Sequence, residues 1–205
     1  MNPMSIVNED ALPSNNGASV LPADPKMREL MARYGRVTLK RRSEFLTLCR
    51  SVIAQQISTK AADTIRQKFH QRFGQEPGAL ARASLHDIQR CGVSSRKAAC
   101  LRDLANGALA GEFEKLYELP DEQITDRLTA IKGIGPWTAE MFLIFSLARP
   151  NVWPLRDAGL RTAARRVYEI STIEEVECLG SRFVPLRSIA AVYLWRSLEN
   201  AEHTH

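Results

Sequence analysis

LTAIKGIGPWTA, residues 128–139, joins two helical patterns through a pair of glycines. Apolar residues recur at helical spacing over residues 121–131 and again over residues 137–147. Glycine accepts positive φ and lets another backbone come close, and Pro136 suits the first turn of a helix. The stretch therefore predicts a short helix, a tight hairpin and a second helix.

The hairpin predicts a site for phosphate. Backbone N–H groups near a helix N-terminus carry partial positive charge and suit a phosphate oxygen, although such contacts read no base sequence. An ordinary turn between two helices is the alternative. The residues expected to contact DNA here are Lys132, Gly133, Ile134, Gly135 and Thr138.

The pattern L-x-x-I-K-G-I-G-x-W-T-A resembles the hairpin of the helix-hairpin-helix (HhH-GPD) superfamily of DNA glycosylases. In that superfamily a Gly/Pro-rich loop and an essential aspartate follow about twenty residues later; here they correspond to residues 148–156 and Asp157. Residues 44–195 resemble the bacterial 3-methyladenine DNA glycosylase II group, best at 51–62 and 128–161.

This resemblance implies an all-α molecule of two helical lobes with the active-site cleft between them. Residues 44–149 would form the lobe that contains the hairpin, and residues 25–43 and 150–205 the second lobe. Residues 1–24, rich in Asn, Ser, Pro and Ala, predict a mobile tail or an extended strap. Strand-like alternation is absent. Besides the hairpin helices, helical patterns are found at 25–34, 44–54, 59–73, 84–90, 95–108, 158–170 and 185–199.

Asp157 is the candidate catalytic residue. Breaking an N-glycosidic bond builds positive charge on the sugar, and a nearby carboxylate stabilises that charge or orients the attacking water. An aspartate before a helix is also a routine N-cap that pairs with a basic residue four positions later, here Arg161. The spacing from the hairpin matches the superfamily, which favours catalysis, and a helix N-terminus favours an ionised carboxylate.

The resemblance also implies a monofunctional enzyme. A relative with lyase activity has a lysine nucleophile just before the Thr-Ala of the second hairpin helix, where this chain has Trp137. We therefore expect hydrolysis by water, an abasic product and no strand cleavage.

Aromatic residues suggest the substrate class. Alkylation at purine N3 or N7 makes the base positive, which favours binding to electron-rich rings. Trp137, Trp195, Met141 and Trp153 are the candidates for the base pocket, with ordinary core packing as the alternative. Met141 stands where one relative has a pocket tyrosine, and Arg156 stands where it has a second acid.

Two adjacent glutamines lie between helical patterns at residues 55–56. The segment SVIAQQISTKAA resembles the part of alkylbase glycosylases whose loop side chain replaces the flipped nucleotide, so Gln56 is the candidate plug and Gln55 its neighbour at the DNA. A solvated helix end is the alternative. Arg161 is also expected to contact DNA. Arg90, Arg96, Lys97 and Arg102 are interpreted mainly as a solvated helix face.

The composition fits a DNA-binding protein. The chain of 205 residues has a net charge of +5, and residues 25–205 carry 28 Lys and Arg against 20 Asp and Glu. No apolar run is long enough to cross a bilayer and no signal segment is found, so we expect a cytoplasmic protein that does not bind membranes. The resemblance implies a monomer, because glycosylases bound to a duplex need only one copy.

The four cysteines are scattered, with no C-x-x-C pair. No metal site and no cofactor are expected. Some relatives carry a four-cysteine iron–sulfur cluster near the C-terminus, where this chain has only Cys178. The resemblance leaves room for a monovalent cation at the hairpin carbonyls.

Double-stranded DNA with alkylated bases is the expected partner. Two other functions stay open. One is a glycosylase for deaminated or mispaired bases, and the other is a non-catalytic DNA-binding module.

Overall fold

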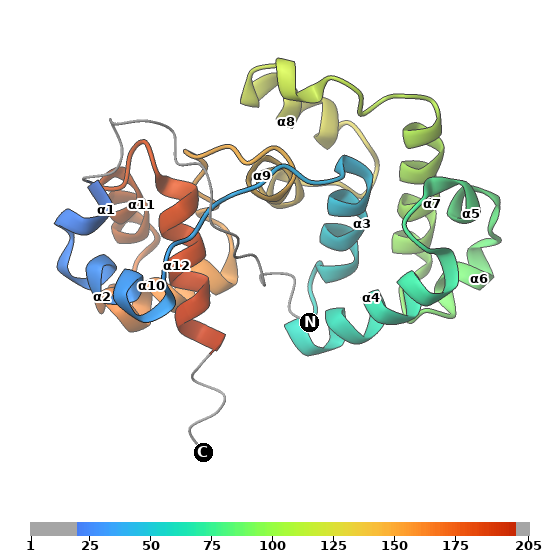
Figure 1. Cartoon of the computed structure of the whole chain (residues 1–205). Helices are drawn as coiled ribbons and strands as arrows, with labels where there is room; N and C mark the ends of the chain where they lie inside the picture. Colours follow the sequence, from blue (N-terminus) through green and yellow to red (C-terminus); the bar gives the residue numbers. More distant parts are fainter. Residues whose placement is uncertain (1–19, 200–205) are drawn as a thin grey trace. The chain divides into compact units, whose positions relative to one another are not determined.

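The computed structural model describes residues 20–199, and every regular element in that range is a helix. The prediction of an all-α fold is confirmed. The chain divides into two compact units (Figure 1). Within the described residues, unit 1 comprises 41–147, and unit 2 comprises 20–40 and 148–199. The sequence had predicted a first lobe of residues 44–149, so both of its boundaries lie within three residues of those of unit 1.

Unit 1 is built around helix α3, which packs against both α7 and α9. Seven of the eleven residues of α3 are buried, and Ser43 caps its first turn through a hydrogen bond to Leu46 N–H. The elements of unit 1 are α3 (Glu44–Ala54), α4 (Thr59–Phe73), α5 (Pro77–Arg82), α6 (Leu85–Gln89), α7 (Ser95–Leu109), the 3₁₀ turn η1 (Leu116–Glu118), α8 (Asp121–Thr129) and α9 (Pro136–Phe145).

Unit 2 is built around helix α12, which packs against both α2 and α10. Residues 189–195 of α12 are all buried, because neighbouring helices cover it on several sides. The elements of unit 2 are α1 (Val20–Ala23), α2 (Pro25–Tyr34), α10 (Ala158–Tyr168), α11 (Ile173–Ser181) and α12 (Arg187–Glu199).

Residues 20–24 are ordered, which corrects the expected mobile tail over this part of the chain. Val20–Ala23 is helical, and the buried carboxylate of Asp24 caps α2 through Met27 N–H. The same carboxylate accepts hydrogen bonds from Tyr168 Oη at 2.8 Å and from Arg182. These contacts tie the start of the described chain to unit 2. Residues 1–19 lie outside the described residues.

Helix α11 was not predicted from the sequence. It begins with a capping box, in which Glu175 N–H donates to Thr172 Oγ1 while the Glu175 carboxylate accepts from Thr172 N–H. The Thr-x-x-Glu spacing is a sequence signal that could have identified this helix. The last helix begins at Arg187, two residues after the predicted start at Pro185.

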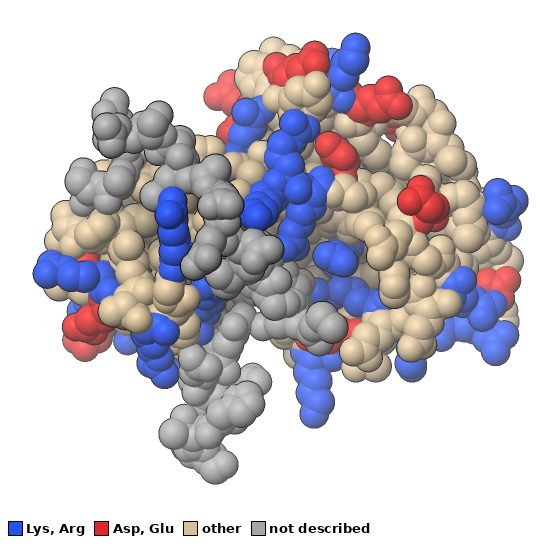
Figure 2. Space-filling model, viewed as in Figure 1, with Lys and Arg blue, Asp and Glu red and all other residues tan. Residues whose placement is uncertain are grey.

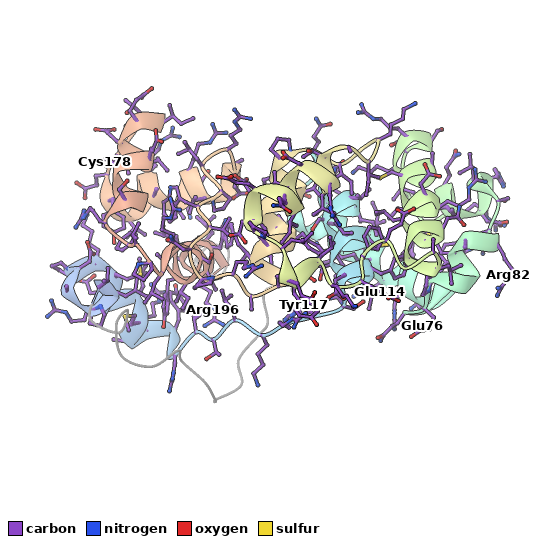
Figure 3. All side chains as sticks on the ribbon, turned by 90° about the horizontal axis from the view of Figure 1, so that it is seen from above. Glu76, Arg82, Glu114, Tyr117, Cys178 and Arg196 are labelled. Carbon is purple, nitrogen blue, oxygen red and sulfur yellow. The ribbon has the colours of Figure 1, made fainter. Side chains whose placement is uncertain are left out.

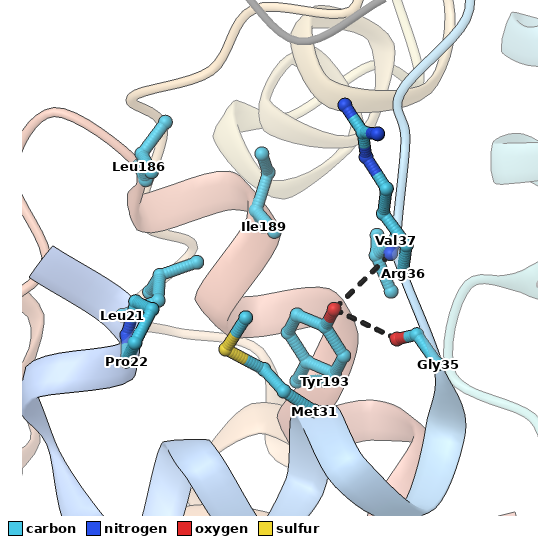
Figure 4. A pocket seen from close by; sticks show the side chains of 9 residues that line it. All are labelled: Leu21, Pro22, Met31, Gly35, Arg36, Val37, Leu186, Ile189 and Tyr193. Atoms are coloured by element: carbon cyan, nitrogen blue, oxygen red, sulfur yellow. Dashed lines mark hydrogen bonds between the residues drawn. The ribbon is translucent and has the colours of Figure 1, made fainter. Parts of the chain in front are cut away.

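An apolar cavity of about 370 Å³ lies within unit 2 (Figure 4). Its lining side chains include Leu21, Met31 and Ile189, and Arg36 is the one charged lining residue. The Tyr193 hydroxyl donates to Gly35 O and accepts from Val37 N–H. None of the residues predicted for the active site lines this cavity.

In the described part of the chain no helix is long and apolar enough to cross a membrane.

Charged side chains are distributed unevenly over unit 1. Helix α4 carries Lys60, Arg66, Lys68 and Arg72 against one acid, Asp63, whereas the first turn of α8 is acidic. In the view of Figure 2, Lys and Arg lie near α4 and acidic side chains gather around α8. The basic surplus is therefore not spread evenly over the helices of this unit.

Candidate nucleic-acid interface and active site

The predicted hairpin is present between α8 and α9, and Gly133 is required in it for two reasons. Its φ is +101°, a region that side-chain-bearing residues rarely adopt. A Cβ atom at this position would also lie 3.0 Å from Cys100 Sγ, on α7. The backbone of the hairpin thus passes directly over the thiol of Cys100, at a distance that only glycine permits.

Gly135 differs from Gly133 in backbone conformation and surroundings, although the sequence pattern does not distinguish the two. Its φ is −108°, and a Cβ at this position would meet nothing within 4 Å. Gly135 is the N-cap of α9, and within the described residues neither Gly133 N–H nor Gly135 N–H donates a hydrogen bond. Two N–H groups beside a helix N-terminus, with open space at Gly135, suit an anionic oxygen.

Two of the residues predicted to contact DNA at the hairpin face the protein instead. Ile134 is 5% exposed, and its N–H donates to Ile131 O at 3.0 Å. Thr138 is 1% exposed, its N–H donates to Gly135 O, and its hydroxyl oxygen accepts from Gln55 Nε2. Both predictions are corrected, because these groups already make contacts within unit 1. Lys132 is exposed, as a DNA contact requires.

Gln55 and Gln56, between α3 and α4, have different surroundings. The Gln55 amide nitrogen donates to Gly133 O at 3.0 Å and to Thr138 Oγ1 at 2.9 Å, which uses both of its N–H groups. Gln55 therefore bridges the end of α3 to the hairpin, and its contact with DNA stays a prediction. Gln56 is exposed and has a φ of +56°, so its side chain projects from an unusual backbone conformation.

Asp157, in unit 2, precedes α10 and caps it. Its Oδ1 accepts from Leu160 N–H at 2.6 Å and from Trp195 Nε1 at 2.8 Å. Gly159 makes room for this arrangement, since a Cβ there would lie 3.1 Å from Asp157 Oδ1 and 3.2 Å from the Trp195 ring. The side chain of Asp157 is partly exposed. A carboxylate oriented by two N–H donors and still open to solvent can act on a bound substrate.

The loop before Asp157 is anchored to α12 at several points. Ser188 Oγ donates to Arg149 O at 2.7 Å and accepts from Val152 N–H at 2.9 Å. Arg187 donates through Nε and a terminal nitrogen to Asn151 O. Ser188 and Arg187 were not predicted from the sequence, because their partners are backbone groups about 36 residues away. The loop that carries Asp157 is consequently held by hydrogen bonds.

Trp153 is a core residue of unit 2, which corrects its predicted place in a base pocket. It is 9% exposed, its indole N–H donates to Val176 O at 3.1 Å, and its ring lies 6.3 Å from that of Phe183. A Cβ on Gly180 would overlap the Trp153 ring at 2.5 Å, so α11 covers the indole closely. The indole is occupied by packing rather than available to a ligand.

The other predicted pocket residues lie in both units. Trp137, partly buried, and Met141, buried, lie on α9 of unit 1, whereas Trp195 is buried in unit 2 against Asp157. The structure thus brings Trp195 and Asp157 into direct contact. Arg161 is exposed on α10, one turn after Asp157.

The cysteines are divided between the units. Cys49, Cys91 and Cys100 are buried in unit 1, and Cys178 is exposed in unit 2, on the outer side of α11 (Figure 3). Burial raises the pKa of the Cys100 thiol to about 11 and raises that of Cys49 further. Among the described residues, no group of three or more His, Cys, Asp or Glu side chains could hold a metal ion.

Comparisons with known proteins point to one family. A family model described as HhH-GPD superfamily base excision DNA repair protein matches residues 49–185. The chain is 34% identical over 177 residues to DNA-3-methyladenine glycosylase 1 of Schizosaccharomyces pombe, covering 82% of this chain and 78% of that protein. It is 31% identical over 173 residues to a putative DNA-3-methyladenine glycosylase of Bacillus subtilis, covering 77% and 60% respectively.

Solved structures agree with the sequence matches. The structure of the S. pombe 3-methyladenine DNA glycosylase in complex with abasic DNA gives a TM-score of 0.80 at 32% identity, covering 91% of this chain and 98% of that one. The structure of the 3-methyladenine DNA-glycosylase of Archaeoglobus fulgidus gives a TM-score of 0.78 at 31% identity, covering 90% of this chain and 68% of that one. Together with the hairpin and the capped aspartate, these matches confirm the predicted resemblance: the chain belongs to the HhH-GPD superfamily of base excision DNA repair proteins.

Proposed function

We propose that this protein is a DNA glycosylase of the 3-methyladenine DNA glycosylase II type, which removes alkylated purines such as 3-methyladenine and 7-methylguanine from double-stranded DNA. The observation that carries the proposal is the carboxylate of Asp157, partly exposed and oriented by N–H donors from Leu160 and Trp195. The relatives named as 3-methyladenine glycosylases, at 31% and 34% identity, support this choice of substrate.

Asp157 would assist the departure of the base. As the bond between C1′ and the base nitrogen breaks, the alkylated base takes the bonding electrons and leaves neutral, while positive charge develops on the sugar. The nearby carboxylate stabilises that charge, and the oxygen of water then bonds to C1′ and releases a proton to solvent.

The hairpin would bind the DNA backbone. The N–H groups of Gly133 and Gly135 donate to no protein acceptor among the described residues, and Lys132 beside them is exposed. Together they offer two hydrogen-bond donors and one positive charge to a phosphate oxygen. This contact is independent of base sequence, as a repair enzyme that scans DNA requires. Part of the affinity would depend on salt concentration.

We further propose that the enzyme lacks lyase activity. The superfamily resemblance places the lyase lysine at the position of Trp137, whose side chain has no nucleophilic nitrogen. The hydrolysis described above then ends at an abasic site with an intact strand. One polypeptide carries every group that this reaction uses, so we propose that it acts as a monomer. We also propose that the carbonyl groups of the hairpin can bind a monovalent cation.

The test is incubation of the protein with duplex DNA methylated by an alkylating agent, followed by chromatography of the released bases. We expect free 3-methyladenine and 7-methylguanine, with strand breaks only after alkali treatment. Parallel duplexes with a single uracil, hypoxanthine or mispaired adenine test the other lesion classes. Release confined to one of those duplexes would overturn the assigned substrate, and breaks without alkali would overturn the absence of lyase activity.

A further inference from the structure

Within unit 1, a chain of hydrogen bonds connects three helices to the hairpin. We propose that Lys97 and Gln55 form a brace that fixes the loop carrying Gln56 to the phosphate-binding hairpin, so that Lys97 is a positioning residue for insertion of Gln56 into DNA. The inference rests on the proposed function, because it assigns a device to the base-flipping step of that reaction.

The first half of the brace is the side chain of Gln55. Both of its N–H groups are used, one by Gly133 O in the hairpin and one by Thr138 Oγ1 in the first turn of α9. Thr138 is buried, so removal of the amide would leave its hydroxyl without this donor in a dry environment. The end of α3 is thereby attached to both sides of the hairpin.

The second half is Lys97, which reaches across from the first turn of α7. Its Nζ donates to Ile53 O at 2.9 Å and to Gln55 O at 2.7 Å. The last carbonyl groups of a helix lack partners within that helix, and a cation there also offsets the negative end of the helix dipole. Burial lowers the pKa of Lys97, in agreement with a side chain turned into the protein.

The residue that the brace presents is Gln56. Its φ of +56° lies in the left-handed region, which is unfavourable for a residue with a side chain unless its surroundings compensate. The backbone is fixed on both sides, by Lys97 at Gln55 O and by the Ser58 cap, which accepts from Ala61 N–H. Gln56 itself is exposed and lies in the turn between α3 and α4.

One consequence follows for DNA binding. Because Gly133 supplies a phosphate-binding N–H and a carbonyl that holds Gln55, the phosphate contact and the plug loop share one rigid arrangement. Docking of the hairpin on a phosphate would then set the position of Gln56 to within the tolerance that insertion requires. A displacement of about 1 Å at such a site is enough to lower a rate up to roughly 100-fold.

The experiment uses the full chain and a duplex with a tetrahydrofuran abasic analogue opposite 2-aminopurine, whose fluorescence reports unstacking by the plug. Lys97→Met and Gln55→Met keep the length of the side chains but remove the donors. Lys97→Arg keeps both charge and donors, and Lys68→Met removes a charge from exposed α4 without touching the brace. Duplex affinity is measured separately by fluorescence anisotropy.

For saturating protein, we expect Lys97→Met and Gln55→Met to reduce the fluorescence change and the single-turnover release of 3-methyladenine about 10- to 100-fold. The duplex affinity of both variants should match that of Lys68→Met. Lys97→Arg should recover most of the fluorescence change and of the base release. The double variant should be no worse than the poorer single variant, because both residues act through the same loop.

Unchanged insertion in both donor-free variants would overturn the brace, and so would additive losses in the double variant. Equal losses of affinity and insertion would also overturn it, since that result indicates general damage to unit 1. If Lys97→Met does not fold, Gln55→Met alone decides the question. The abasic analogue contains no base to release, so insertion is measured even if the wild-type protein removes no alkylated purine. Failure of the proposed function is thus distinguishable from failure of the brace.

Discussion

The hairpin of unit 1 and the aspartate site of unit 2 are both placed at a helix N-terminus, but they are built from different parts of the chain. In the hairpin the proposed phosphate-binding groups are the backbone N–H groups of Gly133 and Gly135, and of these two residues Gly133 alone has a positive φ. In unit 2 the proposed catalytic group is one carboxylate, oriented by a backbone N–H and an indole N–H. We therefore expect DNA binding to be sensitive to side chains added at the hairpin, and base release to be sensitive to the charge of the Asp157 side chain.

Asp157→Asn tests the chemical half of this comparison and should have the largest effect. Asparagine also caps helices well, so the fold of α10 should be kept. The loss of the negative charge should lower single-turnover release of 3-methyladenine about 10³-fold. Release is followed by chromatography, with thermal unfolding as the control. Release at the wild-type rate would show that Asp157 only caps α10 and that another group assists the reaction, whereas no release by the wild-type protein would indicate a non-catalytic DNA-binding module.

Gly135→Asp tests whether the hairpin binds a phosphate at Gly135. Aspartate is a favourable N-cap and meets open space here, so α9 should stay stable, but its carboxylate would repel the phosphate. We expect duplex affinity to fall about 100-fold, which corresponds to about 2.7 kcal/mol. Gly135→Asn is the matched control of nearly equal size without the charge, and should lose much less. Anisotropy titrations at two salt concentrations measure both; equal affinities for the two variants would exclude a phosphate at this position.

Gly159→Ala tests whether base release depends on the orientation of the Asp157 carboxylate. The added methyl group would lie 3.1 Å from Asp157 Oδ1 and 3.2 Å from Trp195, so one of them must move. We expect release to fall about tenfold, with duplex affinity unchanged. Ala158→Gly, at the neighbouring exposed position, is the control for a change of backbone in the same turn. A wild-type rate for Gly159→Ala would mean that the carboxylate needs no fixed orientation.

Trp153→Phe should have the smallest effect on function. The variant loses the hydrogen bond to Val176 O and part of the buried ring, so we expect unfolding to become easier by about 2 kcal/mol. The ratio of released 3-methyladenine to 7-methylguanine should stay the same, because the indole is covered by α11. Thermal denaturation and base analysis check the two statements. A changed ratio would restore Trp153 to the base pocket.

Much of the fold could be predicted from the sequence, because helical periodicity and caps are local signals. The hairpin was found from the two glycines, and the cap at Asp157 from its position before a helix. The sequence could not distinguish Gly133 from Gly135, since the close approach of Cys100 to Gly133 comes from a helix thirty residues earlier. Local patterns give the elements, but contacts between distant helices decide which of two similar residues is constrained.

Side-chain direction was the main source of error at the site. Lys97 was interpreted as part of a solvated helix face, yet its amine binds carbonyl groups of α3. The sequence also did not show that the amide nitrogen of Gln55 binds the hairpin and α9. A long polar side chain has several directions open to it, and the choice depends on unpaired acceptors that only the folded chain brings near. Short groups such as Asp157 and the glycines stay close to their backbone, so their positions are easier to predict from local patterns.

In the proposed enzyme, the hairpin of unit 1 binds the DNA backbone, and the carboxylate of Asp157 in unit 2 stabilises the sugar as the base leaves. The most direct measurement is a single-turnover titration of a methylated duplex with Asp157→Asn and Gly135→Asp side by side, which yields an affinity and a maximal rate of base release for each. We expect Asp157→Asn to keep the affinity and lose the rate, and Gly135→Asp to lose affinity and approach the wild-type rate at saturation. Parallel loss of affinity and rate in both variants would contradict the claim.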